Sequence, residues 1–128
     1  MDENNIKEVQ ERLDDIIIEY LDLEEDDYLS VLFLGGGCYA YATVLKNILH
    51  RGHIVHDKVQ GHCALEVAGD YYDINGKIKI NEYNFKPMSQ ADHLYCSAEY
   101  GFEDSDPEEM HTFVTNVTEE YLKMSLDN

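Results

Sequence analysis

A cysteine that directly follows three glycines is the first feature of this sequence that could do chemistry. Gly35-Gly36-Gly37 precedes Cys38, and the apolar and small residues that follow predict a helix that begins at this cysteine. The amides and the dipole at a helix N-terminus favour an anion, so they lower the pKa of a thiol placed there. Glycines let a substrate carbonyl approach the backbone closely. Cys38 is therefore a candidate nucleophile, and its own amide is a candidate donor to an oxyanion.

A histidine at the start of a β-like run is the candidate base for this thiol. In an extended strand His62 shares a face with Ala64 and Glu66, while Cys63 points the other way into the expected core. A nucleophilic cysteine needs a base, and the imidazole in turn needs an acceptor that orients it. Asp73, on the next β-like run, is the candidate acceptor.

The turn between these two runs decides whether Asp73 reaches the imidazole. A two-residue turn at Gly69-Asp70 would pair Glu66 with Asp73. Asp73 would then lie four residues, or roughly 13 Å at ~3.3 Å per residue, from His62. Asn75 would lie about half as far away, on the same face of the sheet. Either the turn is wider or bulged and brings Asp73 closer, or Asn75 orients the ring.

Three stretches between residues 35 and 77 resemble the core of papain-like and transglutaminase-like thiol enzymes, especially their small bacterial and phage members. They are Gly36-Gly37-Cys38-Tyr39-Ala40, Gly61-His62-Cys63-Ala64-Leu65-Glu66-Val67 and Tyr71-Tyr72-Asp73-Ile74-Asn75-Gly76. The resemblance implies that Cys38 is the nucleophile, His62 the general base and acid, and Asp73 the orienting group. It also implies acyl-transfer chemistry on amides, esters or thioesters. Papain-like enzymes have an oxyanion-stabilising glutamine upstream of the cysteine, and here only Gln10, in the first predicted helix, precedes it.

The histidines and the later cysteines raise a zinc centre as a second kind of site. The residues concerned are His50, His53, His56, His93 and Cys96. Three-residue steps between the first three suit a helix, but Gly52 breaks that helix, and the sequence has no Cys-x-x-Cys or His-x-x-x-His pair. We therefore expect no metal and no cofactor. Cys63 and Cys96 are interpreted as inert core thiols.

Hydrophobic periodicity predicts the elements that position these residues. Predicted helices cover residues 4–23, 38–50, 89–96 and a last segment that starts at 107. Predicted strands cover residues 54–59, 62–68, 71–74 and 77–80, with tight turns at Gly69-Asp70 and Asn75-Gly76. Residues 28–34 are either a strand or a buried lead-in. Asn4 or Asn5 can cap the first helix, and Asp106, Pro107 and Glu109 form a capping box at the last.

This order of elements predicts one α+β domain that spans residues 1–128. A central helix that carries Cys38 packs on a small antiparallel sheet that carries His62 and Asp73. Helices from the two ends of the chain flank this core. The plan matches the papain/transglutaminase-like core that the resemblance implies.

The charge balance limits the partners. The 128 residues include 9 Lys and Arg against 27 Asp and Glu, which gives a formal net charge of −18. Such a chain is repelled by phosphate backbones and anionic membranes, so we expect neither direct nucleic-acid binding nor membrane binding. The acidic start is no secretory signal, and three cysteines without framework spacing fit a reducing compartment. We expect a cytoplasmic protein, in the host cytoplasm if a phage encodes it.

Two functions from different classes fit these observations. The first is a thiol-dependent hydrolase or acyl transferase that acts on an amide, ester or thioester through Cys38, His62 and Asp73. The alternative is an acidic phage-type inhibitor or DNA-mimic protein, built on a catalytically inactive papain-like scaffold, that binds a basic protein. A third hypothesis combines the two, as an enzyme whose acidic surface recruits a basic protein substrate.

Overall fold

The computed structural model describes residues 3–22, 37–78, 83–99 and 107–127, which form an α+β fold as predicted. The described part of the chain contains four helices and one five-stranded antiparallel sheet. In chain order the elements are α1 (Glu3–Leu21), α3 (Cys38–Leu49), β1 (His53–Asp57), β2 (His62–Val67), β3 (Asp70–Asp73), β4 (Gly76–Ile78), β5 (Lys86–Pro87), α4 (Gln90–Glu99) and α5 (Pro107–Asp127).

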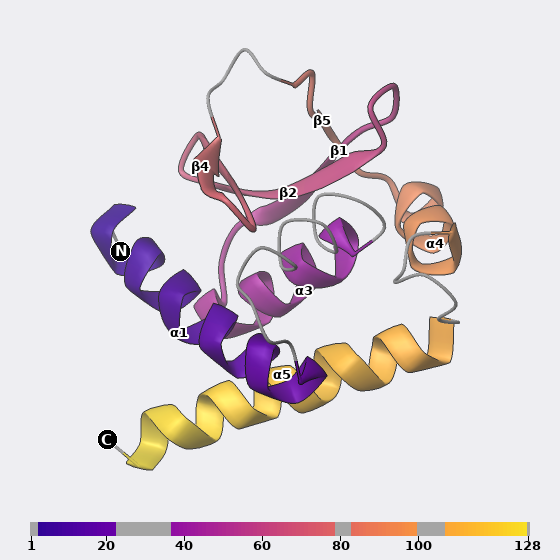
Figure 1. The fold of residues 1–128 in the computed structure, drawn as a ribbon. Helices are drawn as coiled ribbons and strands as arrows, with labels where there is room; N and C mark the ends of the chain where they lie inside the picture. The colour runs from indigo at the N-terminus through magenta and orange to yellow at the C-terminus, as the bar shows by residue number, and fades with distance from the viewer. Residues whose placement is uncertain (1–2, 23–36, 79–82, 100–106, 128) are drawn as a thin grey trace.

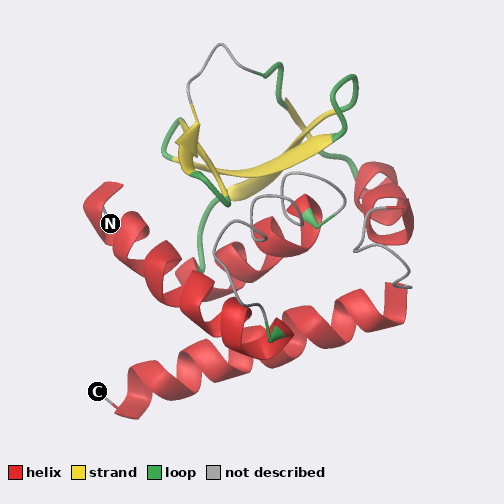
Figure 2. Ribbon diagram, viewed as in Figure 1, coloured by secondary structure: helices red, strands yellow, loops and turns green. Residues whose placement is uncertain are grey.

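The sheet lies on one side of the molecule and the helices lie on the other. The strand order is β4-β3-β2-β1-β5, so β2 is the central strand and pairs with both β1 and β3. Helix α3 packs against β1, β2 and β3, and α5 packs against both α3 and α1 (Figure 1). Figure 2 shows the same arrangement as a layer of strands above a layer of helices. The predicted central helix is therefore confirmed.

Two apolar clusters cover the two faces of the sheet. The larger one lies between sheet and helices, where alternate residues of β2, namely Cys63, Leu65 and Val67, meet α3. This alternation is what a strand with one face on a core requires. The smaller cluster contains Ala64, and it includes three half-buried aromatic side chains on the far face: Tyr71, Tyr83 and Phe85.

Helix α1 begins earlier and ends earlier than predicted. It begins at Glu3, so Asn4 and Asn5 lie inside the helix and the prediction that either caps it is wrong. It ends at Leu21, because Asp22 takes a positive φ of 55° and donates its N–H to the Glu19 carbonyl. A residue in the left-handed region is a common way to end a helix.

The chain turns sharply between α3 and β1. His50, with φ 57°, ends α3 by donating its N–H to the Lys46 carbonyl. Gly52 follows with φ 94°, and a Cβ there would lie 2.7 Å from the Glu66 carbonyl oxygen. Glycine is thus needed where the chain passes against β2.

The hairpin between β2 and β3 differs from the predicted one. Val67 pairs with Asp70, so the two turn residues are Ala68 and Gly69, with φ 52° and 89°. Two positive φ values are typical of the turn type that matches the twist of a two-residue hairpin. The predicted turn at Gly69-Asp70 is wrong because Ala68 accepts a conformation that usually selects glycine, asparagine or aspartate.

The remaining predicted elements fall into three groups. The helix around 89–96 and the last helix are confirmed as α4 and α5, and the strands are confirmed with shifts of one or two residues at their ends. β5, which pairs with β1 through Lys86 and Pro87, was missed because a two-residue edge strand containing proline lacks a strand pattern. The predictions for residues 23, 28–34, 79–80 and 106, and for the glycines at 35 and 36, lie outside the described residues.

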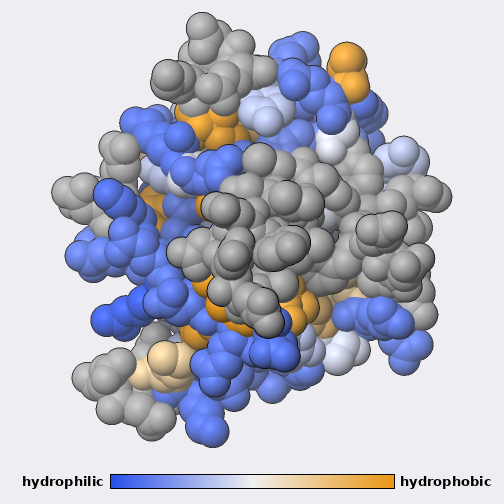
Figure 3. Space-filling model, viewed as in Figure 1, coloured by the Kyte–Doolittle hydropathy of each residue, from blue (hydrophilic) through white to orange (hydrophobic). Residues whose placement is uncertain are grey.

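Most of the coloured residues in Figure 3 are hydrophilic, with small hydrophobic patches between them. No helix in the described ranges is long and apolar enough to cross a membrane. That residues 1–128 make a single domain stays a prediction.

Candidate active site

Cys38 is the first residue of α3, and its sulfur faces the start of β2. Gly37 takes the N-cap position with φ −83° and, lacking a side chain, does not cap the helix. No side chain of Gly37 therefore accepts the amides of the first turn, and these amides favour negative charge in front of the helix. The backbone N–H of Cys63 donates to the Cys38 sulfur at 3.3 Å. Cys38 is only 2% exposed, so the sulfur is held by both elements below the surface.

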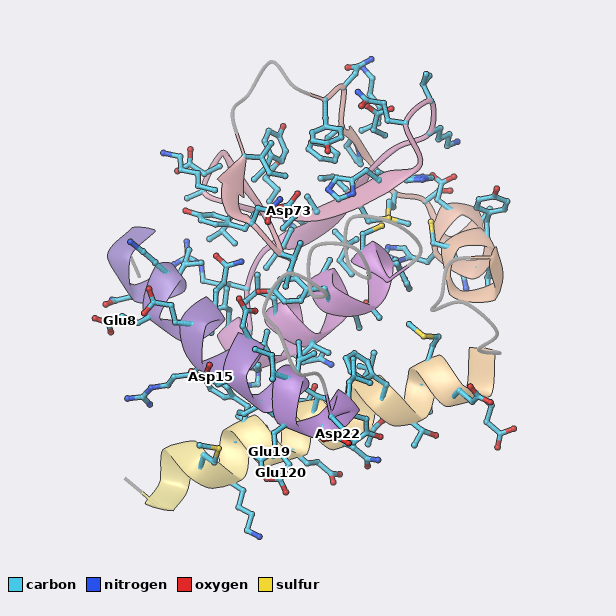
Figure 4. All side chains as sticks on the ribbon, viewed as in Figure 1. Glu8, Asp15, Glu19, Asp22, Asp73 and Glu120 are labelled. Atoms are coloured by element: carbon cyan, nitrogen blue, oxygen red, sulfur yellow. The ribbon has the colours of Figure 1, made fainter. Side chains whose placement is uncertain are left out.

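His62 and Asp73 form a buried hydrogen-bonded pair. Nε2 of His62 lies 2.8 Å from Oδ2 of Asp73. The other carboxylate oxygen accepts the backbone N–H of Asn75 at 2.9 Å. Of the two predicted acceptors, Asp73 therefore faces the ring, and Asn75 holds Asp73 through its amide. Figure 4 shows Asp73 at the sheet, apart from the other labelled acidic residues, which lie on α1, directly after α1 or on α5.

The observed register explains how this pair forms. Leu65 pairs with Tyr72, and the continuation of that register puts Asp73 opposite Ala64. Asp73 therefore lies two positions from His62 along the ladder, where the predicted turn would have put it four away. The shift of the turn moves the pairing by an even number of positions, so Asp73 keeps the predicted face of the sheet.

Cys38 and His62 favour each other's charged form. Hydrogen bonding from Cys63 lowers the pKa of Cys38, burial opposes this, and His62 lowers it further, to about 5. Burial alone would lower the pKa of His62, but Asp73 and the Cys38 sulfur outweigh it and raise the pKa to about 9. A thiolate beside an imidazolium is the reactive form of a catalytic cysteine.

Nδ1 is the ring nitrogen of His62 that remains for proton transfer. It is buried and has no partner of regular hydrogen-bond geometry in the described part of the chain, while Nε2 is occupied by Asp73. The sulfur of Cys38 is nevertheless close enough to raise the pKa of the ring. Loose contacts between nucleophile and base commonly tighten when substrate binds.

Aromatic rings hold the imidazole on the far face of the sheet. The ring of Tyr83 stacks on that of His62 with centroids 4.7 Å apart, and Phe85 lies at 6.1 Å. Such stacking fixes the plane of the ring and stabilises its cationic form. The sequence alone did not indicate this support, because residues 81–105 carry no regular pattern.

Asp57 fixes the loop that leads into His62. Its carboxylate accepts the amides of Val59 and Gln60 within the loop, and also the amide of Asn84, next to the ring that stacks on His62. Asp57 is buried, and these amides lower its pKa. One carboxylate thus sets the path of two segments that touch the imidazole.

Gln10 supports Asp73 from helix α1. It is a buried residue whose Nε2 donates to the Asp73 backbone carbonyl at 2.7 Å and to the Tyr41 hydroxyl at 3.2 Å. That hydroxyl in turn donates to Asp14 at 3.1 Å. The sequence does hint at this role, because Gln10 is a polar residue on the apolar face of α1 that Ile6 and Leu13 form.

The two cysteines interpreted as inert lie in a group that could hold a metal ion. Ligand atoms of His56, Cys63 and Cys96 all lie within 4.8 Å of one another, and all three residues are buried. The other histidines of the expected zinc pattern lie elsewhere: His50 and His53 are exposed, and His93 contacts the Tyr39 hydroxyl at 3.0 Å.

Comparison with known proteins identifies the family. The family model described as phage YunG-like protein matches residues 15–123, which include the cysteine, histidine and aspartate described above. No curated protein and no solved structure matches the chain. The papain-like resemblance has no support from these comparisons. Because the match covers well over half of the sequence, this chain belongs to the phage YunG-like family.

Proposed function

We propose that this phage-type protein is a thiol-dependent hydrolase or acyl transferase on a papain/transglutaminase-like core. The observation that carries the proposal is the buried His62–Asp73 pair, 2.8 Å apart, beside a cysteine at the start of a helix. Nucleophile, base and orienting group are the parts that covalent acyl transfer needs. The substrate class is an amide, ester or thioester, and the host cytoplasm is the proposed location.

The proposed reaction has two halves. The Cys38 thiolate attacks the carbonyl carbon, a C–S bond forms, and the carbonyl electrons move to oxygen. His62 then gives its Nδ1 proton to the leaving group as the bond to that group breaks, which leaves an acyl-thioester on Cys38. Water or another nucleophile attacks this thioester, loses a proton to His62 and releases the acyl group. The thiolate and the imidazolium are thereby restored.

Oxyanion stabilisation in this proposal comes from the start of α3. The Cys38 amide belongs to the uncapped first turn and supports a developing negative charge. Gln10 does not supply the second donor of papain-like enzymes, because its amide group donates to Asp73 and to Tyr41. Its role in the proposal is to hold the main chain of Asp73.

Selective alkylation tests the nucleophile. Cys38 and Cys63 are equally hidden, at 2% and 1% exposed, so Cys63 is a matched internal control for access. We expect iodoacetamide to modify Cys38 first, as mapped by peptide mass spectrometry. His62→Ala should slow this reaction by roughly 100-fold or more, in line with the loss of a positioned base. Equal labelling of the two cysteines, unchanged in His62→Ala, would mean that Cys38 is an ordinary buried thiol.

An acidic surface favours binding as a second candidate function. Glu19 of α1 and Glu119 and Glu120 of α5 line a groove of about 410 Å³ that also contains Tyr20. Figure 4 shows Glu19 and Glu120 on these helices, away from Asp73. We propose a basic protein, such as a nuclease whose DNA site the carboxylates mimic, as the partner of this groove.

Salt dependence and charge reversal of the groove test this candidate. Binding to a basic nuclease should weaken steeply as salt is added, and Glu19→Lys with Glu120→Lys should remove it. Glu8→Lys, at the other end of α1 in Figure 4, is the matched control and should bind nearly as the parent does. Salt-independent binding contradicts the candidate, while retention of binding in Cys38→Ala would separate it from catalysis.

A further inference from the structure

We infer that His56, Cys63 and Cys96 form a binding site for a zinc ion between the sheet and helix α4. The ligand atoms are a ring nitrogen of His56 and the sulfurs of the two cysteines, all within 4.8 Å of one another. This site adjoins the proposed thiol site, because the Cys63 amide donates to the Cys38 sulfur, but none of its three side chains is the nucleophile, the base or the orienting carboxylate.

The spacing of the ligand atoms is close to that of a tetrahedral zinc centre. The two sulfurs lie 4.0 Å apart, and Nδ1 of His56 lies 3.9 Å from the Cys96 sulfur. Zinc bonds of about 2.3 Å to sulfur and about 2.0 Å to nitrogen put tetrahedral ligand atoms about 3.5 to 3.8 Å apart. A contraction of a few tenths of an ångström brings these two distances to zinc geometry, and the remaining pair, His56 and Cys63, is within 4.8 Å.

The fold itself brings the three ligands together. His56 of β1 and Cys63 of β2 are direct partners in the antiparallel register, so their side chains share the helix-facing side of the sheet. Cys96 comes from α4, and its sulfur reaches Cys63 of β2 and His56 of β1. No short spacing in the sequence indicated these three ligands together, because Cys63 and Cys96 are separated by 33 residues.

The donor set selects the kind of ion. Two thiolates and one imidazole suit zinc and other soft or borderline metals, whereas calcium and magnesium require oxygen ligands. Binding converts two thiols to thiolates and releases two protons, so the ion with its two thiolates carries no net charge into the core. Three protein ligands leave one coordination position for water or another small ligand.

Cobalt and zinc titrations of the reduced full-length chain test the site. One cobalt ion per chain should bind with the charge-transfer bands of thiolate ligands and the strong visible bands of a tetrahedral centre, and zinc should displace it. Cys63→Ser and Cys96→Ser should each weaken binding by roughly 100-fold or more, since even the loss of an outer-shell partner costs 10- to 100-fold. His56→Ala should weaken it as well.

Cys38→Ser is the matched control, because it removes a neighbouring thiol without removing a ligand. Cys38 contacts both the amide and the side chain of Cys63, but the Cys38 sulfur is not a member of the metal group. We expect Cys38→Ser to bind cobalt within about tenfold of the parent, a smaller loss than the roughly 100-fold expected when a ligand is removed. Alkylation of Cys38 in metal-free protein then tests the proposed enzyme separately. The zinc site can therefore be rejected without rejecting the thiol chemistry, and the reverse also holds.

Three results would overturn the inference. They are no metal uptake by folded, reduced protein, uptake that persists in Cys96→Ser, and uptake that disappears in Cys38→Ser. Circular dichroism shows whether each variant is folded, and if a serine variant unfolds, Cys96→Ala replaces it. A rise in the melting temperature of the parent protein with added zinc gives an independent readout, because an ion that binds only the native state stabilises it.

Discussion

His62 is the residue on which the proposed chemistry depends most. One ring nitrogen bonds Asp73, the other is left for proton transfer, and Tyr83 stacks on the ring face. The bond to Asp73 fixes which nitrogen faces the carboxylate, and the stacking of Tyr83 fixes the plane of the ring. The proton on the other nitrogen is then in a defined position. An imidazole held in this way is prepared for acid–base work before substrate arrives.

Asp73→Asn tests the orienting carboxylate. The substitution preserves the size of the side chain but removes the charge that supports the imidazolium, so the rate of Cys38 alkylation should fall by roughly 10² to 10⁴. The measurement is the rate of iodoacetamide modification at neutral pH. Asn75→Ala is the control, since Asn75 contacts Asp73 through its backbone amide, and it should react nearly as the parent does.

The sequence indicated the three residues of the candidate site but not the residues that hold them. Cys38, His62 and Asp73 stand out locally, as a cysteine after glycines, a histidine that opens a strand and an aspartate on the following strand. Gln10 and Tyr83 reach them through packing of distant segments, which a single sequence does not encode in any local pattern. The turn was misplaced because Ala68 takes a positive φ that its residue type rarely adopts.

Helix α1 reaches the site through one buried amide side chain. Gln10→Leu keeps the volume of that side chain but loses the bond to the Asp73 carbonyl, which should cost about 1 kcal/mol and slow Cys38 alkylation several-fold. The measurements are thermal unfolding and alkylation rate. Tyr41→Phe removes the neighbouring hydroxyl but keeps the Gln10–Asp73 bond. If Tyr41→Phe slows alkylation equally, packing and not that bond explains the effect.

Helix α4 begins with a reciprocal pair of hydrogen bonds. The Ser89 amide donates to the Asp92 carboxylate and the Asp92 amide donates to the Ser89 hydroxyl, which is a capping box. Lys58, in the loop between β1 and β2, lies 3.1 Å from the same carboxylate. The Ser89 amide, followed by Lys58, lowers the pKa of Asp92 to about 2.

This capping box predicts a pH dependence of α4. Because the folded pKa of Asp92 is below its ordinary value of 3.8, its stabilisation is present above about pH 4 and is lost as the pH falls toward 2. NMR titration of the Asp92 carboxyl should show the low pKa. Lys58→Ala should raise it only in part, because the Ser89 amide remains. A titration at the ordinary value in the parent protein would contradict the capping box.

At the scale of the whole molecule, one apolar layer joins the helices to the sheet. Its members come from α1, α3, α5 and the central strands, so distant parts of the chain depend on the same core. The sequence predicted this layer well, because the helical and strand periodicities both point toward it. It did not predict the cluster of His56, Cys63 and Cys96, because these residues come from two strands and a helix that are distant in sequence.

Ile17→Ala tests how strongly the terminal helices support that layer. Ile17 is fully buried on α1, which packs against α5. The variant should lose roughly 2–5 kcal/mol of unfolding free energy, as buried isoleucine truncations do. Denaturant unfolding gives the value. Leu122→Ala, at a half-exposed position on α5, should cost much less, and an equal loss at both sites would argue against a shared core.

The alternation of β2 gives the β1–β2 loop a chemical consequence. His62 and Cys63 are neighbours in the chain, yet one contacts the aromatic rings of the far face and the other lies in the core with α3. If the removal or addition of a single residue among Lys58, Val59, Gln60 and Gly61 shifted β2 by one position, every β2 side chain would move to the opposite face. The thiol would then replace the imidazole beside Asp73, and the imidazole would enter the sulfur cluster. Both proposed sites therefore depend on the register of β2, which this loop precedes.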